Sequence, residues 1–155
     1  MVAPAPPRVR RLSAGDLPFV RALSREAFAD FSRDPVPSTM SMVARHTAFV
    51  AEREGAAIGL SVVRLVSEQG SRERWAELLA IAVLEHERGR GVGRALLRHT
   101  ERAARNAGAR WISLHTADAN LAALELFTKT GYELERRHPR YYLDVFDACE
   151  LRKAL

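Results

Sequence analysis

The sequence predicts a mixed α/β fold in a single domain spanning residues 1–155, and three observations indicate it. The chain has 155 residues, of which 47% are hydrophobic, and that is enough to bury one core of this size. The spacing of its apolar residues changes along the chain between the helical and the strand period. A strand, a helix and a second strand follow one another between residues 74 and 117, which is the order of a parallel βαβ unit.

The N-terminal half is predicted to form a tail, a strand, two helices and a hairpin. Ser13 and Asp16 make an S-x-x-D signal, and apolar residues at helical spacing follow it. Ser38 comes after a stretch broken by prolines and is predicted to cap a second, shorter helix. The expected elements are a flexible tail at 1–7, a strand at 8–12, a helix from 17 to near Phe31, a helix from 38 to about Arg45, and hairpin strands at 47–54 and 58–66.

The C-terminal half carries the most apolar strand. RWAELLAIAVL, residues 74–84, is apolar on both faces, as expected of a central strand. The expected elements are strands at 74–84, 109–117, 132–137 and 146–152 and helices at 91–107 and 120–130. The whole pattern predicts a mixed sheet of about 6–7 strands with about 4 helices.

The charge of the chain excludes few classes of function. The net charge is +5, and arginine carries the excess because Lys129 and Lys153 are the only lysines. Arginine suits bidentate binding of phosphate or carboxylate, so the positive charge is compatible with binding to nucleic acid, a ribosomal surface, an acidic substrate or a phosphorylated cofactor. The arginine bias of a GC-rich genome would explain the excess equally well. Arginines at every fourth position from 90 to 102 form a helix stripe, but without interleaved aromatic residues they do not predict nucleic-acid binding.

The compartment is predicted from what the sequence lacks. It has no apolar run near the roughly 18–20 residues that span a bilayer, and its N-terminus lacks the apolar centre of a signal peptide. Cys149 is the only cysteine, which excludes an internal disulfide and agrees with a reducing compartment. We therefore expect a cytoplasmic protein with no membrane contact and no metal site, and we predict no oligomeric state.

The stretch ERGRGVGRALL, residues 87–97, places three glycines between a predicted buried strand and a predicted helix. Backbone N–H groups of such a turn and of the first helical turn can converge on an anion, and the helix dipole adds to the attraction. The spacing fails both the G-x-G-x-x-G dinucleotide pattern and the P-loop pattern. What remains is R-x-x-G-x-G at 88–93, which indicates a pyrophosphate site or, as the alternative, a simple glycine-rich turn.

With this motif the sequence resembles the GCN5-related N-acetyltransferase (GNAT) family, whose members bind the pyrophosphate of acetyl-coenzyme A with R-x-x-G-x-G. Residues 78–109 are similar to that family's fourth strand and cofactor helix, and DANLAALELFTKTGYE, residues 118–133, resembles its N-x-x-A-x-x-L-[YF]-x-x-x-G-[FY] helix. The resemblance covers roughly residues 8–153 and is specific over 75–145. It implies the GNAT fold, in which the two central parallel strands splay apart to admit the cofactor.

The C-terminal part is similar to the branch of protein N-terminal acetyltransferases that includes the bacterial ribosomal-protein enzymes. ISLHTADAN and the later HPRYYLDVFDACELRKAL carry this likeness, although Val145-Phe146 replaces the branch's usual Gly-Glu. The resemblance implies direct acetyl transfer, within a ternary complex, to a protein or peptide α-amine. A small-molecule amine is the alternative acceptor, and a non-catalytic coenzyme A-sensing module is a further alternative.

The resemblance also implies which residues bind the cofactor. The backbone of residues 81–83 is expected to pair with the pantetheine arm, and Asn120 to bond the cofactor, with an ordinary helix N-cap as its alternative role. Phe127 stands where many members place a tyrosine that protonates the thiolate, but a thiol pKa of about 8.5 makes thiolate a tolerable leaving group. The expected cofactor residues are Ile81, Ala82, Val83, Arg88, Gly89, Arg90, Gly91, Val92, Gly93, Arg94, Asn120 and Phe127.

Two side chains are candidates for the base that must deprotonate an ammonium before it attacks. His115 aligns with a catalytic histidine or glutamate in some N-terminal acetyltransferases, and an unperturbed pKa near 6.5 suits the task. Strand alternation places it on the face opposite Ile112 and Leu114, and a structural histidine is the alternative. Glu77 is the second candidate, as a base through water or as a ligand of the amine, and its alternative role is a solvated strand end.

Tyr141, Tyr142 and Phe31 are expected to line the amine site, with Tyr141 bonding a peptide backbone; an ordinary aromatic strand pair is the alternative for the two tyrosines. Loops near 31–37 and 138–145 distinguish the two kinds of acceptor. A peptide enzyme should keep them open as a groove, whereas a small-molecule enzyme should close them over a charged pocket.

Overall fold

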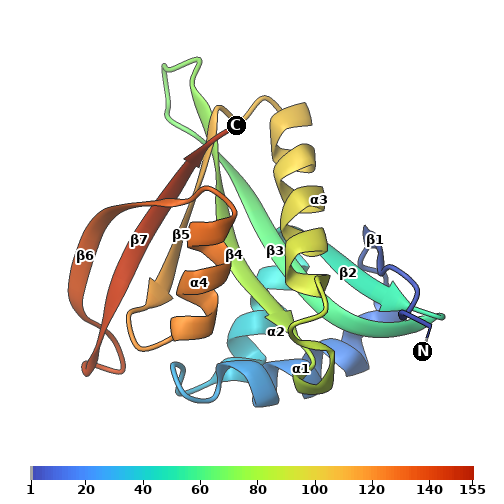
Figure 1. Cartoon of the computed structure of the whole chain (residues 1–155). Coiled ribbons are helices and arrows are strands. Elements are labelled where there is room, and N and C mark those ends of the chain that lie inside the picture. The colour runs from blue at the N-terminus through green and yellow to red at the C-terminus, as the bar shows by residue number, and fades with distance from the viewer. Residues whose placement is uncertain (1) are drawn as a thin grey trace.

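The computed structural model describes residues 2–155, and one seven-stranded sheet forms its centre (Figure 1). The strands are β1 (Arg8–Arg11), β2 (Thr47–Arg53), β3 (Ala56–Ser67), β4 (Arg74–Val83), β5 (Trp111–Ala117), β6 (Glu133–Tyr142) and β7 (Phe146–Ala154). They lie in the order β1-β2-β3-β4-β5-β7-β6. β4 and β5 are parallel, and every other neighbouring pair is antiparallel.

Four α-helices accompany the sheet in the described residues, together with short 3-10 turns at Ala14–Asp16 and at Glu85–Glu87 (η2). The helices are α1 (Leu17–Phe28), α2 (Pro35–Arg45), α3 (Val92–Asn106) and α4 (Leu121–Lys129). The predicted mixed α/β fold is confirmed, and α3 is the crossover of the predicted βαβ unit between β4 and β5.

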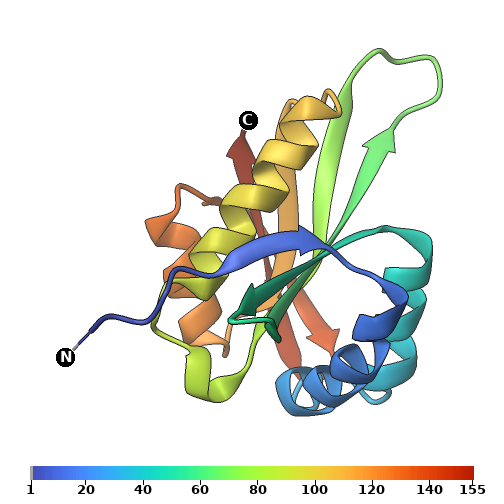
Figure 2. The same ribbon diagram turned by 90° about the vertical axis from the view of Figure 1, so that its right-hand side faces the viewer.

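The helices cover both faces of the sheet (Figure 2). α3 and α4 pack on one face, where Leu96, Ile112 and Phe127 belong to one buried cluster. α1 and α2 pack on the other face, where Val20 and Leu60 belong to a second buried cluster. Within residues 2–155, no helix has both the length and the apolar character needed to cross a membrane.

Three predicted boundaries differ from the structure by three residues or more. The first helix ends at Phe28 rather than near Phe31. The second begins at Pro35 with Asp34 as its N-cap, so the prediction that Ser38 caps it is wrong. A proline is well tolerated at the first helical position, because its missing N–H would have no helical partner there. The strand predicted to end near residue 137 continues to Tyr142, because β6 stays paired with β7 as far as the facing pair Tyr142 and Phe146.

The two parallel strands separate along their length, as the resemblance implied. β4 and β5 share register only from Ala76 opposite Ile112 to Leu78 opposite Leu114. β4 then continues to Val83 while remaining paired with β3 on its other side. The described residues thus leave one edge of β4 without a strand partner beyond Leu78.

Candidate active site

A cavity of about 290 Å³ lies where β4 and β5 separate. Residues 78–81 of β4 and 114–117 of β5 line it. α4 contributes to its wall from one face of the sheet, and α2 with the α1–α2 connection contributes from the other. Because these helices cover opposite faces, the cavity reaches through the sheet. Two substrates can therefore approach from opposite faces and meet between the strands.

The glycine stretch joins the end of β4 to α3 on the face of the sheet that α3 and α4 cover, which we call the donor face (Figure 1). Gly89 and Gly91 have φ of 74° and 84°, a conformation that favours glycine. A Cβ added at either position would meet no atom within 4 Å, so the space beside the loop backbone is open. The first helical bond runs from the N–H of Ala95 to the carbonyl of Gly91 at 3.0 Å, which leaves the preceding N–H groups outside the helix ladder.

Gly93 serves a different purpose from the other two glycines. A Cβ at this position would lie 3.2 Å from a methyl of Leu126 and 3.9 Å from a methyl of Val83. Such a contact with Leu126 is tighter than ordinary packing, so Gly93 lets α3 approach α4 closely. The motif therefore combines two turn glycines with one packing glycine.

The arginines of the motif are exposed, and two of them have identified partners. Arg88 Nε donates to the carbonyl oxygen of Val83 at 3.1 Å, which ties the loop to the end of β4. Arg90 lies 4.0 Å from the carboxylate of Glu87, and Arg94 lies on the first turn of α3. Their exposure leaves the guanidinium groups able to reach a phosphorylated ligand.

Sequence reasoning missed the ion pair that anchors this loop to the sheet. Arg53, the last residue of β2, lies 3.4 Å from Glu87, with its Nε facing Oε2, and the two side chains are only 10% and 11% exposed. Buried charges require partners, so each residue fixes the other. The two residues are far apart in sequence, and only the strand pairing brings them together.

The side chains and the backbone of residues 81–83 have different surroundings. Ala82 is buried against α1 and α2, and Ile81 lines the cavity. Their backbone pairs with β3 on one side, while the opposite edge faces the gap. Side chains can therefore pack in the core while that backbone edge stays available to a ligand.

Asn120 and Phe127 both line the cavity from the α4 side. Asn120 is the N-cap of α4, where its Oδ1 accepts a bond from the N–H of Ala123 at 3.2 Å. Its side-chain amide still has donors to offer. Phe127 is 3% exposed and packs edge-on against Tyr132, with the ring centres 5.4 Å apart.

His115 lines the same cavity from β5. Its side chain lies on the predicted face, opposite the buried Ile112 and Leu114, and is 35% exposed. The ring of Tyr141 stacks on it at a centre distance of 5.2 Å with an angle of 4°. Burial lowers the pKa of His115 below 6.5; the charge of His138 lowers it further, and two nearby carboxylates oppose the shift. The lowered pKa favours the neutral imidazole.

Glu77 lies near His115 but outside the cavity lining. Its carboxylate accepts a bond from Arg64 Nε at 3.0 Å and a second bond from Nη2 of the same residue. The ion pair occupies one carboxylate oxygen of Glu77. The two catalytic candidates thus differ in position: His115 reaches the gap, and Glu77 influences it through its charge.

The two loops that were expected to distinguish the acceptors are in contact. Phe31 packs against Phe146 and Tyr142 with ring-centre distances of 5.2 Å and 6.0 Å. Arg33 and Asp144 add a weak exposed pair at 3.9 Å. The described lining of the cavity contains no Asp, Glu, Lys or Arg. Neither expectation holds completely, since the loops touch but close over an uncharged cavity.

Tyr141 and Tyr142 divide between surface and cavity. Tyr142 and Phe31 line the cavity, and burial raises the pKa of Tyr142 to about 12. Tyr141 is 51% exposed above His115. Of the aromatic residues predicted for the amine site, Phe31 and Tyr142 thus lie in the cavity wall and Tyr141 lies at the surface.

Sequence reasoning also missed His138 and Glu150, which lie beside His115. His138 Nε2 is 2.8 Å from Glu150 Oε2, and His115 Nε2 is 4.0 Å from the same oxygen. No local motif connects the three residues. A correct register of β5 with β7 would have identified one contact, because it places His115 directly opposite Glu150.

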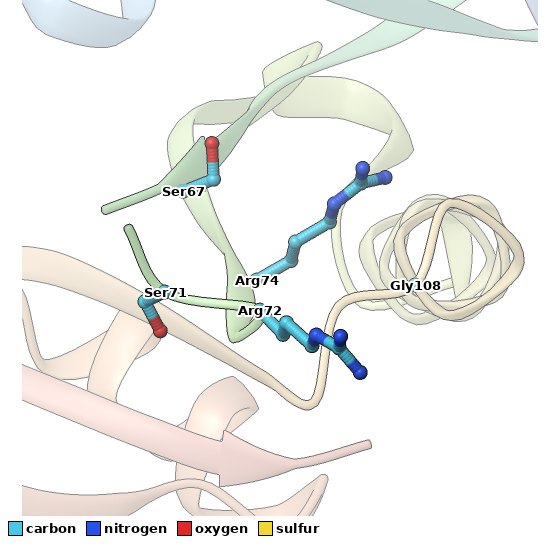
Figure 3. Close-up of a pocket in the computed structure, with 5 residues that line it drawn as sticks. All are labelled: Ser67, Ser71, Arg72, Arg74 and Gly108. Carbon is cyan, nitrogen blue, oxygen red and sulfur yellow. The ribbon is translucent and has the colours of Figure 1, made fainter. Parts of the chain in front are cut away.

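A second hollow, of about 460 Å³, lies at the other end of β4 (Figure 3). It lies between the β3–β4 connection and the C-terminal end of α3, and it contains none of the residues predicted for the site. Its lining is Ser67, Ser71, Arg72, Arg74 and Gly108. The lining of the cavity between β4 and β5 includes six of the predicted residues: Phe31, Ile81, His115, Asn120, Phe127 and Tyr142.

Comparison with known proteins identifies the family. Residues 17–132 match the sequence profile of the Acetyltransferase (GNAT) family. An uncharacterized N-acetyltransferase of Methanocaldococcus jannaschii is 29% identical over 152 residues, which cover 94% of this chain and 90% of that protein. The catalytic subunit NAA10 of the N-terminal acetyltransferase A complex of Arabidopsis thaliana is 32% identical over 110 residues, which cover 69% of this chain but only 56% of that protein.

The fold is shared with Arabidopsis thaliana NAA60, whose crystal structure contains acetyl-CoA. The TM-score is 0.83 at 19% identity, over 97% of this chain and 99% of that chain. The resemblance to N-terminal acetyltransferases is borne out by the NAA10 relative. The matched profile, the relatives and the splayed strands lead to one conclusion: this chain belongs to the acetyltransferase (GNAT) family and is an N-acetyltransferase of that type.

Proposed function

We propose that the protein transfers the acetyl group of acetyl-CoA to the α-amino group of a protein or peptide N-terminus. The observation that carries this proposal is the cavity through the sheet, with the glycine loop on its donor face and His115 on its lining. A transfer reaction needs two substrates held end to end, and the gap between β4 and β5 provides room for their reacting groups.

The donor side fits a pyrophosphate. The positive φ of Gly89 and Gly91 and the empty space beside them expose the backbone, and the N-terminus of α3 adds its dipole. Residues 88–94 would hold the diphosphate of acetyl-CoA. The unpaired edge of residues 81–83 would bind its pantetheine arm, and Asn120 would bind a polar group of the same ligand. Bound there, acetyl-CoA would supply its acetyl group as a thioester that an uncharged amine can attack.

His115 is the residue to which we assign removal of the amine proton. It lines the cavity, and its lowered pKa keeps Nε2 able to accept a proton at pH 7, directly or through water. Its partial exposure lets the proton pass to solvent. Glu77 remains the second candidate, because its negative charge lies near enough to attract an ammonium group.

Phe127 leaves the departing sulfur without a hydroxyl donor from α4. Thiolate is a tolerable leaving group, since a thiol has a pKa of about 8.5. The edge of β4 offers backbone N–H groups in place of side chains to steady developing negative charge. The substitution is therefore compatible with turnover and does not favour a purely coenzyme A-sensing role.

The lining of the cavity favours a peptide over a polycationic small molecule. Phe28, Phe31 and Met42 form part of its wall on the acceptor side, and no carboxylate is present in the described lining to neutralise several ammonium groups. We expect a peptide whose first side chain is apolar. The similarity to NAA10, a catalytic subunit of an N-terminal acetyltransferase complex, supports the same acceptor class.

A peptide panel tests the proposal. Coenzyme A release and peptide mass would be measured with acetyl-CoA and peptides that differ only in the first residue, alongside spermidine and an aminoglycoside. We expect a single acetyl group on the α-amine, fastest with an apolar first residue. Pre-acetylated peptides that carry an internal lysine are the matched control and should not react. Turnover of the small amines alone would contradict the proposal that the acceptor is a peptide. Binding of acetyl-CoA without turnover of any amine would support a coenzyme A-sensing role.

A further inference from the structure

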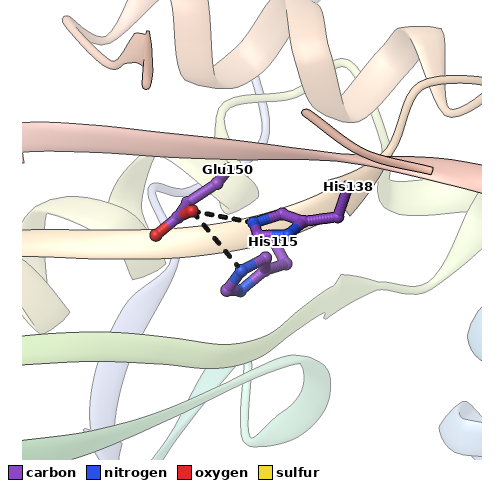
Figure 4. A group of neighbouring side chains, drawn as sticks. All are labelled: His115, His138 and Glu150. Carbon is purple, nitrogen blue, oxygen red and sulfur yellow. Dashed lines mark hydrogen bonds and ion pairs between the residues drawn. The ribbon is translucent and has the colours of Figure 1, made fainter. Parts of the chain in front are cut away.

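Three strands bring two histidines and a carboxylate to one place. His115 comes from β5, His138 from β6 and Glu150 from β7. Glu150 lies directly opposite His115 in one ladder, and in the other ladder opposite Arg136, two residues before His138. Both rings point toward one carboxylate oxygen of Glu150 (Figure 4). The sheet itself therefore fixes the spacing of the three side chains.

The distances suit a single ion. The Glu150 Oε2 atom is 2.8 Å from His138 Nε2 and 4.0 Å from His115 Nε2, and one ligand-type atom from each residue lies within 4.8 Å of the others. Ligand atoms about 2.1 Å from a tetrahedral Zn²⁺ are roughly 3.4 Å apart. Side-chain rotations that move the ligand atoms by about 1 Å would bring all three within bonding distance of one ion without moving the strands.

The chemistry and access are those of an open metal site. Two imidazoles with one carboxylate are ligands typical of Zn²⁺ and related transition metals, and three protein ligands leave a fourth position for water. The side chains of His115, His138 and Glu150 are 35%, 31% and 29% exposed. An ion can therefore reach them from solvent.

We propose that His115, His138 and Glu150 bind a divalent transition-metal ion, with Zn²⁺ as the best match to the ligands, and that this ion inhibits acetyl transfer. The inhibitory half rests on the proposed function, because a metal on His115 Nε2 occupies the lone pair that would accept the amine proton. The site thus couples acetyl transfer to the supply of a free metal ion. The metal acts here as a regulator and not as a participant in the reaction.

Metal binding is tested independently of activity. Zn²⁺ would be titrated by calorimetry into the full-length protein, and Co²⁺ would serve as a spectroscopic probe whose visible absorption reports four- or five-coordinate binding. We expect one ion per chain and a loss of affinity of about tenfold or more in His138→Ala and in Glu150→Gln. His46→Ala is the matched control, since His46 caps α2 outside the cluster. Circular dichroism and thermal unfolding would establish that each variant folds.

Inhibition is measured as peptide acetylation by mass, because the free thiol of coenzyme A binds Zn²⁺ itself. We expect Zn²⁺ to inhibit the wild type, a chelator to reverse the inhibition, and His138→Ala to be less inhibited relative to its own metal-free rate. Metal affinity that is equal in the control and in both cluster variants would overturn the site. Binding at the cluster without inhibition would instead contradict the role of His115 in proton transfer.

Discussion

The two sides of the cavity are built in different ways. The side to which we assign the donor offers backbone: the edge of residues 81–83, the turn at Gly89 and Gly91, and the N-terminus of α3. The side to which we assign the acceptor offers side chains brought together from the α1–α2 connection and from three strands, with Phe31 against Tyr142 and His115 under Tyr141. Backbone recognition follows a short contiguous motif, whereas a side-chain site needs the whole fold. The donor is therefore the part of the reaction that a sequence reveals most readily.

The two sides also differ in charge. Exposed arginines surround the donor loop, while the described lining of the cavity has no lysine, arginine or acidic residue. In the proposed function, charge would attract a polyanionic donor from solvent, and apolar walls would select the acceptor by shape. Substitutions on the two sides should consequently affect different kinetic constants.

The largest effect is expected from His115→Ala on the acceptor side. Loss of a general base lowers kcat by about 100-fold or more, while the KM for acetyl-CoA should change little because the donor loop is untouched. Initial rates with a peptide acceptor measure both constants. His46→Ala, outside the site, is the control, and unchanged turnover in His115→Ala would remove this histidine from the mechanism.

The anchor of the donor loop should matter most for stability. Arg53→Met leaves the buried Glu87 with only the exposed Arg90 nearby, 4.0 Å away, and we expect the free energy of unfolding to fall by about 2 kcal/mol. Urea denaturation measures the change. The double variant with Glu87→Met should recover most of the loss, because no unpaired charge remains. A double variant as unstable as the single one would show that the pair is not the anchor.

A Cβ at Gly91 should weaken the binding of acetyl-CoA and leave the binding of the peptide unchanged. Gly91→Ala adds a methyl beside the exposed backbone at φ 84° and is expected to raise the KM for acetyl-CoA about tenfold, equivalent to about 1.4 kcal/mol. The peptide KM should stay close to that of the wild type. Gly70→Ala is a close control, since Gly70 has the same φ of 84° and the same empty surroundings in the distant β3–β4 connection. If both substitutions raised the KM for acetyl-CoA equally, the cause would be backbone strain and not a contact at the donor loop.

Tyr142 should give the acceptor side a distinct pH dependence. Its pKa is raised to about 12 in the folded protein by burial, against about 10 when unfolded. Above pH 10 the unfolded chain loses this proton first, so stability falls as the pH rises toward 12 and is fully present below 10. We expect wild type to lose about 1 kcal/mol more than Tyr142→Phe across this range, allowing for partial exposure. Denaturant titrations at matched pH values measure the difference, and parallel curves would contradict it.

The smallest effect is expected at the β6–β7 turn beside the acceptor site. Leu143 and Asp144 have φ of 53° and 56°, which is unfavourable for leucine. Leu143→Asn should raise the free energy of unfolding by up to about 1 kcal/mol, because asparagine tolerates this conformation better. Leu134→Asn, at an exposed strand position of β6, is the control. Thermal unfolding that shifts equally in both variants would exclude relief of strain as the cause.

Most of the fold could be predicted because its elements follow local periodicity. The order of strands and helices, the crossover α3 and the face of β5 that carries His115 are all confirmed. One error lies where tertiary pairing decides an element's end: β6 continues to Tyr142 because β7 remains beside it. Another is local: α2 begins at Pro35 rather than at Ser38, because a proline is tolerated at the first helical position.

The sequence by itself determined the form of the glycine loop, since glycine spacing between a strand and a helix directly dictates backbone conformation and exposed N–H groups. Only the tertiary structure decided three other features: the pairing of Arg53 with Glu87, the contact of Phe31 with Tyr142, and the gathering of His115, His138 and Glu150. The physical reason is tertiary placement. His115, His138 and Glu150 become neighbours through strand pairing, and a shift of one position would turn each side chain to the opposite face of the sheet. Glu87 and Phe31 lie outside the strands and meet Arg53 and Tyr142 only when the chain folds.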